Sequence, residues 1–210
     1  MPFLIGIVVA SALLEVIAEA SGKRRAVYVL KPLTTSLIVV LALALPNPVS
    51  TFYGAAIVLG LLFSLMGDVF LMLPSDRFVA GLTSFLLAHL CYIAAFSSAA
   101  GSLSVVAVAL LLAWGGLLLW LLWPELGKLR APVTLYSAVL LVMAWTAIGQ
   151  SSNGQPGRAA LAAGGALLFV ASDSALALDR FVRKDRRLQL LVLSTYFAAQ
   201  LLIALSVRAR

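Results

Sequence analysis

The sequence has few of the residues that build metal sites and covalent catalytic centres. Its 210 residues include one cysteine, Cys91, and one histidine, His89. A zinc site takes several histidine or cysteine ligands, and a disulfide within one chain takes a pair of cysteines, so the sequence argues against both. It also contains no GxSxG, P-loop or dinucleotide-binding GxGxxG pattern. We therefore expect neither a metal ion nor a cofactor.

Charged residues are scarce as well. Only 11% of the residues are charged and 63% are apolar, and the mean hydropathy is +1.09. A chain of this composition has too little polar surface to cover a water-soluble domain, which predicts an all-α, polytopic membrane protein. The net charge of +7 does not indicate a nucleic-acid partner, because the basic residues lie mostly in short loops, where they orient the chain and meet anionic lipid headgroups.

Eight apolar segments each approach the roughly 20 residues that a helix needs to cross a bilayer. We place them at residues 3–20, 27–45, 52–73, 78–99, 103–122, 130–149, 158–178 and 188–207. The connections, such as SGKRR, PNPVS and SSNGQPGR, are short and rich in turn-forming or charged residues. We expect a single integral membrane domain over residues 1–210. The first segment is interpreted as a retained helix, because it lacks a basic start and carries Glu15 and Glu19.

Lysine and arginine gather on one side of the predicted bundle. The loops after the first, third, fifth and seventh segments hold Lys23, Arg24, Arg25, Arg77, Lys128, Arg130, Arg180, Arg183, Lys184, Arg186 and Arg187. The opposite side holds only Arg158, Arg208 and Arg210. The positive-inside rule then predicts that both termini lie outside the cell and that the basic loops lie in the cytoplasm.

The two halves of the chain resemble each other. LLFSLMGDVFLMLPSDRFV, residues 61–79, aligns with LLFVASDSALALDRFV, residues 167–182, after a short gap, and YIAA at 92–95 answers YFAA at 196–199. This pattern predicts two parallel repeats, residues 1–101 and 102–210, of four helices each. Asp68 and Asp173 would then be equivalent positions.

Intramembrane polar residues predict a site in the cytoplasmic leaflet. Asp68 and Asp173 each lie about five residues before the cytoplasmic end of a segment, or roughly 7 to 8 Å deep at about 1.5 Å per residue. Lys31 lies near the cytoplasmic start of the second segment. Ionisable residues inside a membrane usually mark a functional site, whereas the competing interpretation is an ion-pair or hydrogen-bond lock between helices. For Lys31 the alternative to ligand binding is a side chain that snorkels to the interface.

Aromatic and polar side chains accompany these charges. Phe85, His89, Tyr92 and Phe96 share one helix face and would suit the wall of a lipid pocket. The further candidates for substrate binding are Tyr136, Ser172, Tyr196 and Gln200, of which the last two, four residues apart, predict a polar seam. For His89 and the tyrosines, hydrogen bonds between helices are the structural alternative.

The order of these motifs resembles the YhhN-like integral membrane family, the lysoplasmalogenases. The motifs are KPL at 31–33, GDVFL at 67–71, FxxGLxxFxxxHxxY at 78–92, Tyr136, GAxxFxxSDS at 165–174 and YxxxQ at 196–200. The resemblance implies an eight-helix hydrolase that cleaves the vinyl ether bond of lysoplasmalogens to a fatty aldehyde and glycerophosphocholine or glycerophosphoethanolamine. It also implies that the two aspartates are the catalytic candidates.

Vinyl ether chemistry agrees with a carboxyl pair. Acid cleavage protonates the alkene carbon, and water then traps the oxocarbenium ion, so the reaction needs an acid and a base. We expect one of Asp68 and Asp173 to donate the proton and the other to stabilise the cation and activate water, with Lys31 and the basic loops near the phosphate. Two alternatives stay open: a proton-coupled transporter of lipids or small molecules, and a lipid-binding protein without chemistry.

Overall fold

The computed structural model describes residues 1–150 and 155–208. The predicted SSNGQPGR connection therefore lies partly, and Arg210 entirely, outside the described residues. In the described ranges the chain forms eight helices, each long and apolar enough to span a bilayer. They are α1 (Pro2–Ala20), α2 (Arg24–Ala44), α3 (Thr51–Met72), α4 (Phe78–Ser98), α5 (Val105–Leu122), α6 (Arg130–Gly149), α7 (Pro156–Ala177) and α8 (Arg186–Leu205). A 3-10 turn, η1 (Gly127–Leu129), precedes α6, and a π-helical turn, η3 (Leu178–Val182), extends α7.

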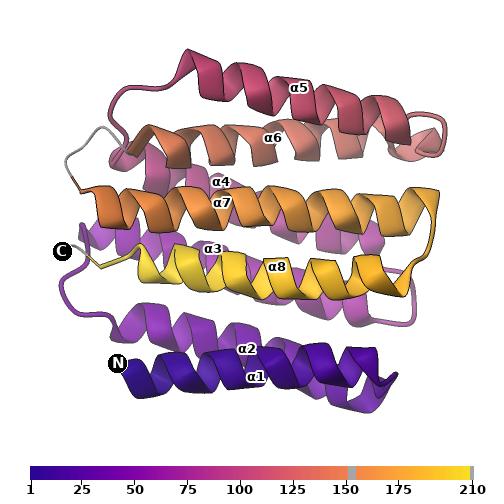
Figure 1. Ribbon diagram of the computed structural model, residues 1–210, viewed down its shortest axis with the longest axis horizontal. Helices are drawn as coiled ribbons and strands as arrows, with labels where there is room; N and C mark the ends of the chain where they lie inside the picture. The colour runs from indigo at the N-terminus through magenta and orange to yellow at the C-terminus, as the bar shows by residue number, and fades with distance from the viewer. Residues whose placement is uncertain (151–154, 209–210) are drawn as a thin grey trace.

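The all-α class and the eight spans are confirmed. The largest difference at any helix end is three residues, where α2 begins at residue 24 against a predicted 27. The helices run side by side along the long axis of the molecule (Figure 1). The start of α1 and the end of α8 lie at one end of the bundle, and the four basic loops lie at the other end (Figure 1). The placement of both termini outside the cell stays a prediction.

The helices pack in a pattern that repeats between the two halves of the chain. The most extensive contacts join α3 to α4 and α7 to α8. In addition, α2 packs against α3 and α8, while α6 packs against α7 and α4. Helices α1 and α5 lie at opposite edges of the bundle (Figure 1), on α2 and α6 respectively. If α1, α2, α3 and α4 are taken as equivalent to α5, α6, α7 and α8, each contact named here has a counterpart in the other half of the chain. The duplication itself stays a prediction.

Small residues allow the tightest of these contacts. A Cβ atom at Gly67 would lie 2.6 Å from the ring of Phe85, and one at Gly165 would lie 2.9 Å from the carbonyl oxygen of Ala199. Such distances are shorter than van der Waals contact, so α3 approaches α4, and α7 approaches α8, only because these positions lack a side chain.

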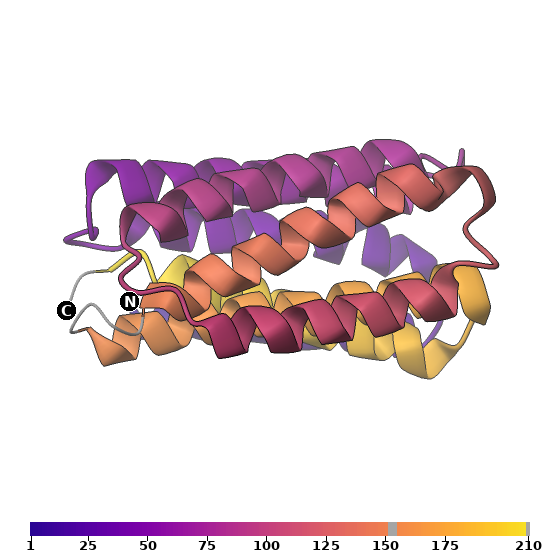
Figure 2. The ribbon, with the colours of Figure 1, turned by 90° about the horizontal axis from the view of Figure 1, so that it is seen from above.

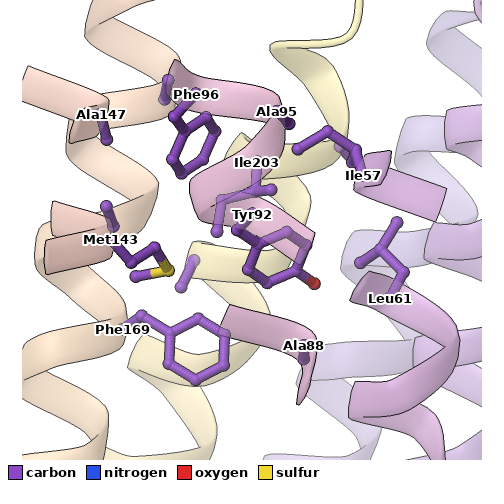
Figure 3. Close-up of a cluster of buried hydrophobic side chains, with 14 of the residues drawn as sticks. Ile57, Leu61, Ala88, Tyr92, Ala95, Phe96, Met143, Ala147, Phe169 and Ile203 are labelled. Carbon is purple, nitrogen blue, oxygen red and sulfur yellow. The ribbon is translucent and has the colours of Figure 1, made fainter. Parts of the chain in front are cut away.

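The centre of the bundle is filled by side chains from α3, α4, α6, α7 and α8. Figure 3 shows Tyr92, Phe96, Met143 and Phe169 in contact at this centre, with the Tyr92 hydroxyl pointing toward α3. The outer helix faces carry exposed apolar side chains, such as Phe3 at 81% and Trp120 at 74% exposure. A protein buried in hydrocarbon is expected to expose such residues, since lipid rather than water surrounds them. Viewed from above, α6 crosses between the α3–α4 layer and the α7–α8 layer (Figure 2).

Candidate functional site

Asp68 is the centre of a buried polar cluster between α2, α3 and α8. Its Oδ2 accepts hydrogen bonds of 2.7 Å from the hydroxyls of both Thr35 and Tyr196. The Nζ of Lys31 lies 3.4 Å from its Oδ1. The Asp68 side chain is only 1% exposed, and that of Lys31 is 13% exposed. A carboxylate at such a site is stabilised by a cation and by directed hydrogen bonds, which are all present here.

A chain of hydrogen bonds extends this cluster toward the middle of the bundle. The Gln200 amide donates to the Tyr196 hydroxyl at 3.2 Å, and the Tyr92 hydroxyl donates to Gln200 Oε1 at 2.8 Å. The Ser64 hydroxyl lies a further 3.4 Å from that of Tyr92. The predicted seam of Tyr196 and Gln200 is confirmed. Because the chain is buried and its members are bonded to one another, it holds Tyr196 in a defined position against Asp68.

Asp173 has a different environment. It lies on α7, is half-buried, and its Oδ2 accepts a hydrogen bond of 2.5 Å from the Tyr136 hydroxyl on α6. In the part of the chain that the structure describes, the ion pairs join Lys31 to Asp68, Arg180 to Asp76 and Arg183 to Asp185, and none involves Asp173. Asp173 thus has a tyrosine partner but no compensating cation.

Aromatic rings in edge-to-face contact lie between the tyrosine partners of the two aspartates. His89 packs against Tyr136 with ring centroids 5.3 Å apart, and against Phe169 at 4.7 Å. Phe169 in turn packs edge-on against Tyr196 at 5.6 Å. Among the described residues, neither nitrogen of the fully buried His89 has a hydrogen-bond partner. Phe85, His89, Tyr92 and Phe96 are buried in the packed core of the bundle, and their role as the wall of a lipid pocket stays a prediction. Within residues 1–150 and 155–208, no hydrogen bond joins the two aspartates directly.

A small cavity of about 50 Å³ lies between α4, α5, α6 and α7. Its walls are mainly apolar and include Leu82, Leu118, Leu122, Leu140 and Phe181. Tyr136 and Asp173 line it, whereas Asp68 does not. This volume is well below the roughly 300–1,000 Å³ of typical small-molecule sites, so the cavity holds a small part of a ligand rather than a whole one. The arrangement presents one carboxyl group and one phenol to a molecule in an apolar space.

Ser172, a predicted binding residue, and Glu15 both lie away from this cavity. Ser172 turns away from the cavity, and its hydroxyl donates to the Val192 carbonyl of α8 at 3.1 Å. Glu15, for which the sequence indicated no role, is fully buried, and its two carboxyl oxygens have no hydrogen-bond partner among the described residues. Its charged neighbours are Lys31, Asp68 and Glu19. Glu15 therefore belongs to the surroundings of the Asp68 cluster.

Sequence reasoning missed Thr35 and Glu15 as neighbours of Asp68. The available signal for Thr35 was its position four residues after Lys31, which places both on one face of α2. Within the described ranges, no three His, Cys, Asp or Glu side chains gather closely enough to hold a metal ion.

Fold and site together define a class: a polytopic helical membrane protein with two intramembrane aspartates near one end of the bundle, Asp68 buried and Asp173 facing an apolar cavity. The YhhN family profile matches residues 26–207, and the chain belongs to this family. No solved structure matches the chain.

Three relatives illustrate the family. Lysoplasmalogenase TMEM86B of Sus scrofa is 37% identical over 157 residues, which cover 74% of this chain and 64% of the relative. Lysoplasmalogenase of Mycobacterium bovis is 40% identical over 153 residues, covering 68% of this chain and 56% of the relative. The uncharacterized membrane protein YhhN of Escherichia coli O6:H1 is 33% identical over 199 residues, covering 93% of this chain and 94% of the relative. The chain thus matches less than two thirds of the length of the relatives named lysoplasmalogenase.

Proposed function

We propose that the protein hydrolyses the vinyl ether bond of lysoplasmalogens, releasing a fatty aldehyde and glycerophosphocholine or glycerophosphoethanolamine. The observation that carries this proposal is a carboxyl group, Asp173, on the wall of an apolar cavity at the end of the bundle. A lysolipid needs such a combination, because its chain is apolar and its cleavable bond requires an acid. The names of the related proteins support the same activity.

Asp173 is the proposed proton donor. It faces the cavity and has no cation partner in the described part of the chain, and an uncompensated carboxylate is costly in a low-dielectric environment. The hydrogen bond from Tyr136 occupies Oδ2 and leaves Oδ1 to carry the proton. This proton is transferred to the alkene carbon that is not bonded to oxygen, and the other alkene carbon becomes part of an oxocarbenium ion.

Asp68 is the proposed carboxylate partner. Lys31 lies against it, so a negative charge is sustained there and stabilises the cation electrostatically. Water adds to the oxocarbenium carbon and gives up a proton to this carboxylate. The resulting hemiacetal collapses, its hydroxyl proton passes to the departing glycerol oxygen, and aldehyde and alcohol are formed.

Asparagine variants of the two aspartates test the proposal. Asp173→Asn and Asp68→Asn keep the side-chain shape but remove acid and base function, so each is expected to lower aldehyde release from lysoplasmalogen by at least about 100-fold. The matched control is Glu125→Gln, an exposed carboxyl in the loop before α6, which should keep wild-type turnover. Near wild-type turnover by either aspartate variant, with the fold verified by size-exclusion chromatography, would disprove the carboxyl mechanism.

A proton-coupled transporter is the second candidate, and the buried Glu15 favours it. An acid without a hydrogen-bond partner inside a membrane bundle is typical of proton pathways. Incubation with a defined lysolipid followed by mass spectrometry separates the two functions. Aldehyde indicates hydrolysis, whereas intact lipid that crosses a proteoliposome membrane only when a proton gradient is applied indicates transport.

A further inference from the structure

A polar groove opens beside the Asp173 cavity at the basic-loop end of the bundle. It is formed by the α3–α4 loop and by the segment from the end of α7 to the start of α8, and its volume is about 400 Å³. Groove and cavity share two lining residues, Phe78 and Leu176, so a thin wall of side chains separates an apolar space from a polar one. A lysolipid has the same division between its chain and its headgroup.

The groove contains a preorganised arginine. Arg180 donates two hydrogen bonds to Asp76, at 3.0 and 2.7 Å, and its guanidinium lies 4.9 Å from the ring centroid of Phe78. Hydrogen bonding from Arg180 lowers the pKa of Asp76 below its ordinary value of 3.8. These contacts hold Arg180 at the border between the groove and the cavity.

Two other cations in the groove have no carboxylate partner. Among the residues that the structure describes, neither Arg77 nor Lys184 takes part in an ion pair. Both line the groove. The other carboxylate in its wall, Asp179, accepts a hydrogen bond of 2.8 Å from the Asp185 amide and one of 3.5 Å from Gln189. Positive charge is thus available for an anion, while both acids of the groove already have donors.

The distance between the groove and Asp173 suits the substrate. Arg180 follows Asp173 by seven residues, or about 10 Å along a helix at about 1.5 Å per residue. In a lysoplasmalogen about six single bonds separate the vinyl ether carbon from phosphorus, which is roughly 7 Å at about 1.2 Å per extended bond. The helix distance exceeds the substrate length by a few ångströms, which leaves room for the phosphate to contact a cation at one end and for the alkene to contact the acid at the other.

We infer that this groove binds the phosphodiester of the lysophospholipid, with Arg77 and Lys184 as its direct partners and Arg180 at the border to the cavity. The inference rests on the proposed hydrolysis, whose substrate it places with the phosphate in the groove and the vinyl ether bond at Asp173. Lys31 is a less suitable partner, because it lies against Asp68 and is mostly buried. The groove therefore makes the enzyme selective for lysophospholipids over alkenylglycerols that lack phosphate.

The inference is tested by measuring KM for a substrate with phosphate and for one without it, in the wild type and in a groove variant. The variant Arg77→Gln/Lys184→Gln removes both unpaired cations from exposed positions. Each basic residue near an anionic lipid headgroup contributes about fivefold in affinity, so we expect KM for lysoplasmalogen to rise about 25-fold with little change in kcat. For 1-alkenylglycerol, wild type and double variant should have equal KM. The matched control, Arg25→Gln/Lys128→Gln, removes exposed cations from the first turn of α2 and from η1, at the same end of the bundle, and should leave the KM of both substrates unchanged.

Binding of a saturated 1-alkyl lysophospholipid, measured by equilibrium dialysis in detergent, separates this inference from the proposed function. If the protein releases no aldehyde but the groove variant weakens this binding about 25-fold, the headgroup site stands and the hydrolysis fails. If aldehyde is released and the groove variant has the wild-type KM, the headgroup site is wrong. The site is also wrong if that variant loses affinity only for vesicles containing anionic lipid, since the groove would then bind the membrane rather than the substrate.

Discussion

The contact between Lys31 and Asp68 leads to a quantitative prediction about stability. The two charged groups are 3.4 Å apart, and their side chains are 13% and 1% exposed. At an effective dielectric constant of about 20, two charges at this distance attract each other by roughly 4–5 kcal/mol. Replacing Lys31 by methionine keeps the volume of the side chain and leaves Asp68 buried without its cation. The hydrogen bonds from Thr35 and Tyr196 remain and offset part of the loss.

We therefore expect Lys31→Met to lower the free energy of unfolding by about 3 kcal/mol, near the range measured when one partner of a buried pair is removed. The double variant Lys31→Met/Asp68→Asn removes both charges, so it should recover most of this loss. Denaturant unfolding in detergent micelles near neutral pH measures both values. Lys23→Met, which changes an exposed lysine before α2, is the control and should unfold like the wild type.

Two results would refute this reasoning. If Lys31→Met costs less than about 1 kcal/mol, the ammonium group does not compensate Asp68. If the double variant is no more stable than Lys31→Met, the loss comes from packing along the lysine stem rather than from an uncompensated carboxylate.

Two further predictions concern packing and pH. Gly165→Ala should destabilise the protein by about 1–3 kcal/mol, because the new methyl group meets the backbone of α8. The control is Gly116→Ala, at a position where nothing lies within 4 Å of the added methyl group. Equal melting temperatures of the Gly165→Ala and Gly116→Ala variants would contradict the close approach of α7 and α8. Since its contact with Arg180 lowers the pKa of Asp76 below 3.8, this contact should stabilise the protein above that pH and cease to do so as the pH falls through the lowered value. The melting-temperature difference between wild type and Asp76→Asn should therefore be present at neutral pH and vanish in acid, and a difference that grows on acidification would show the opposite linkage.

Local physics explains why the helices could be predicted. Each span follows from the thickness of the hydrocarbon, which requires a run of apolar residues whatever the neighbouring helices are. The candidates Asp68 and Asp173 also followed from local sequence, because a carboxyl group inside an apolar run is costly and is seldom retained without a role. Their partners did not follow, because any of several polar side chains at similar depth could reach a given aspartate.

The rotation of each helix about its own axis accounts for most of what the sequence left open. Ser172 and Asp173 are adjacent in the chain, yet Ser172 donates to α8 while Asp173 accepts from α6 and faces the cavity. Glu15 and Glu19 are one helical turn apart, and Glu15 is fully buried while Glu19 is partly exposed. Adjacent residues in a helix point about 100° apart, so a small rotation changes which of them enters the core.

The sequence by itself determined the class of protein, the number and bounds of its spans, and which ionisable residues lie within them. These depend on the free energy of placing each residue in hydrocarbon, which is a property of the residue and its near neighbours. Only the tertiary structure decided that Asp68 is compensated by Lys31 while Asp173 faces an apolar cavity, and that this cavity adjoins a basic groove. Those environments arise where residues distant in the chain pack together, and here Asp68 meets side chains of α2 and α8, whereas Asp173 meets α6 and the cavity.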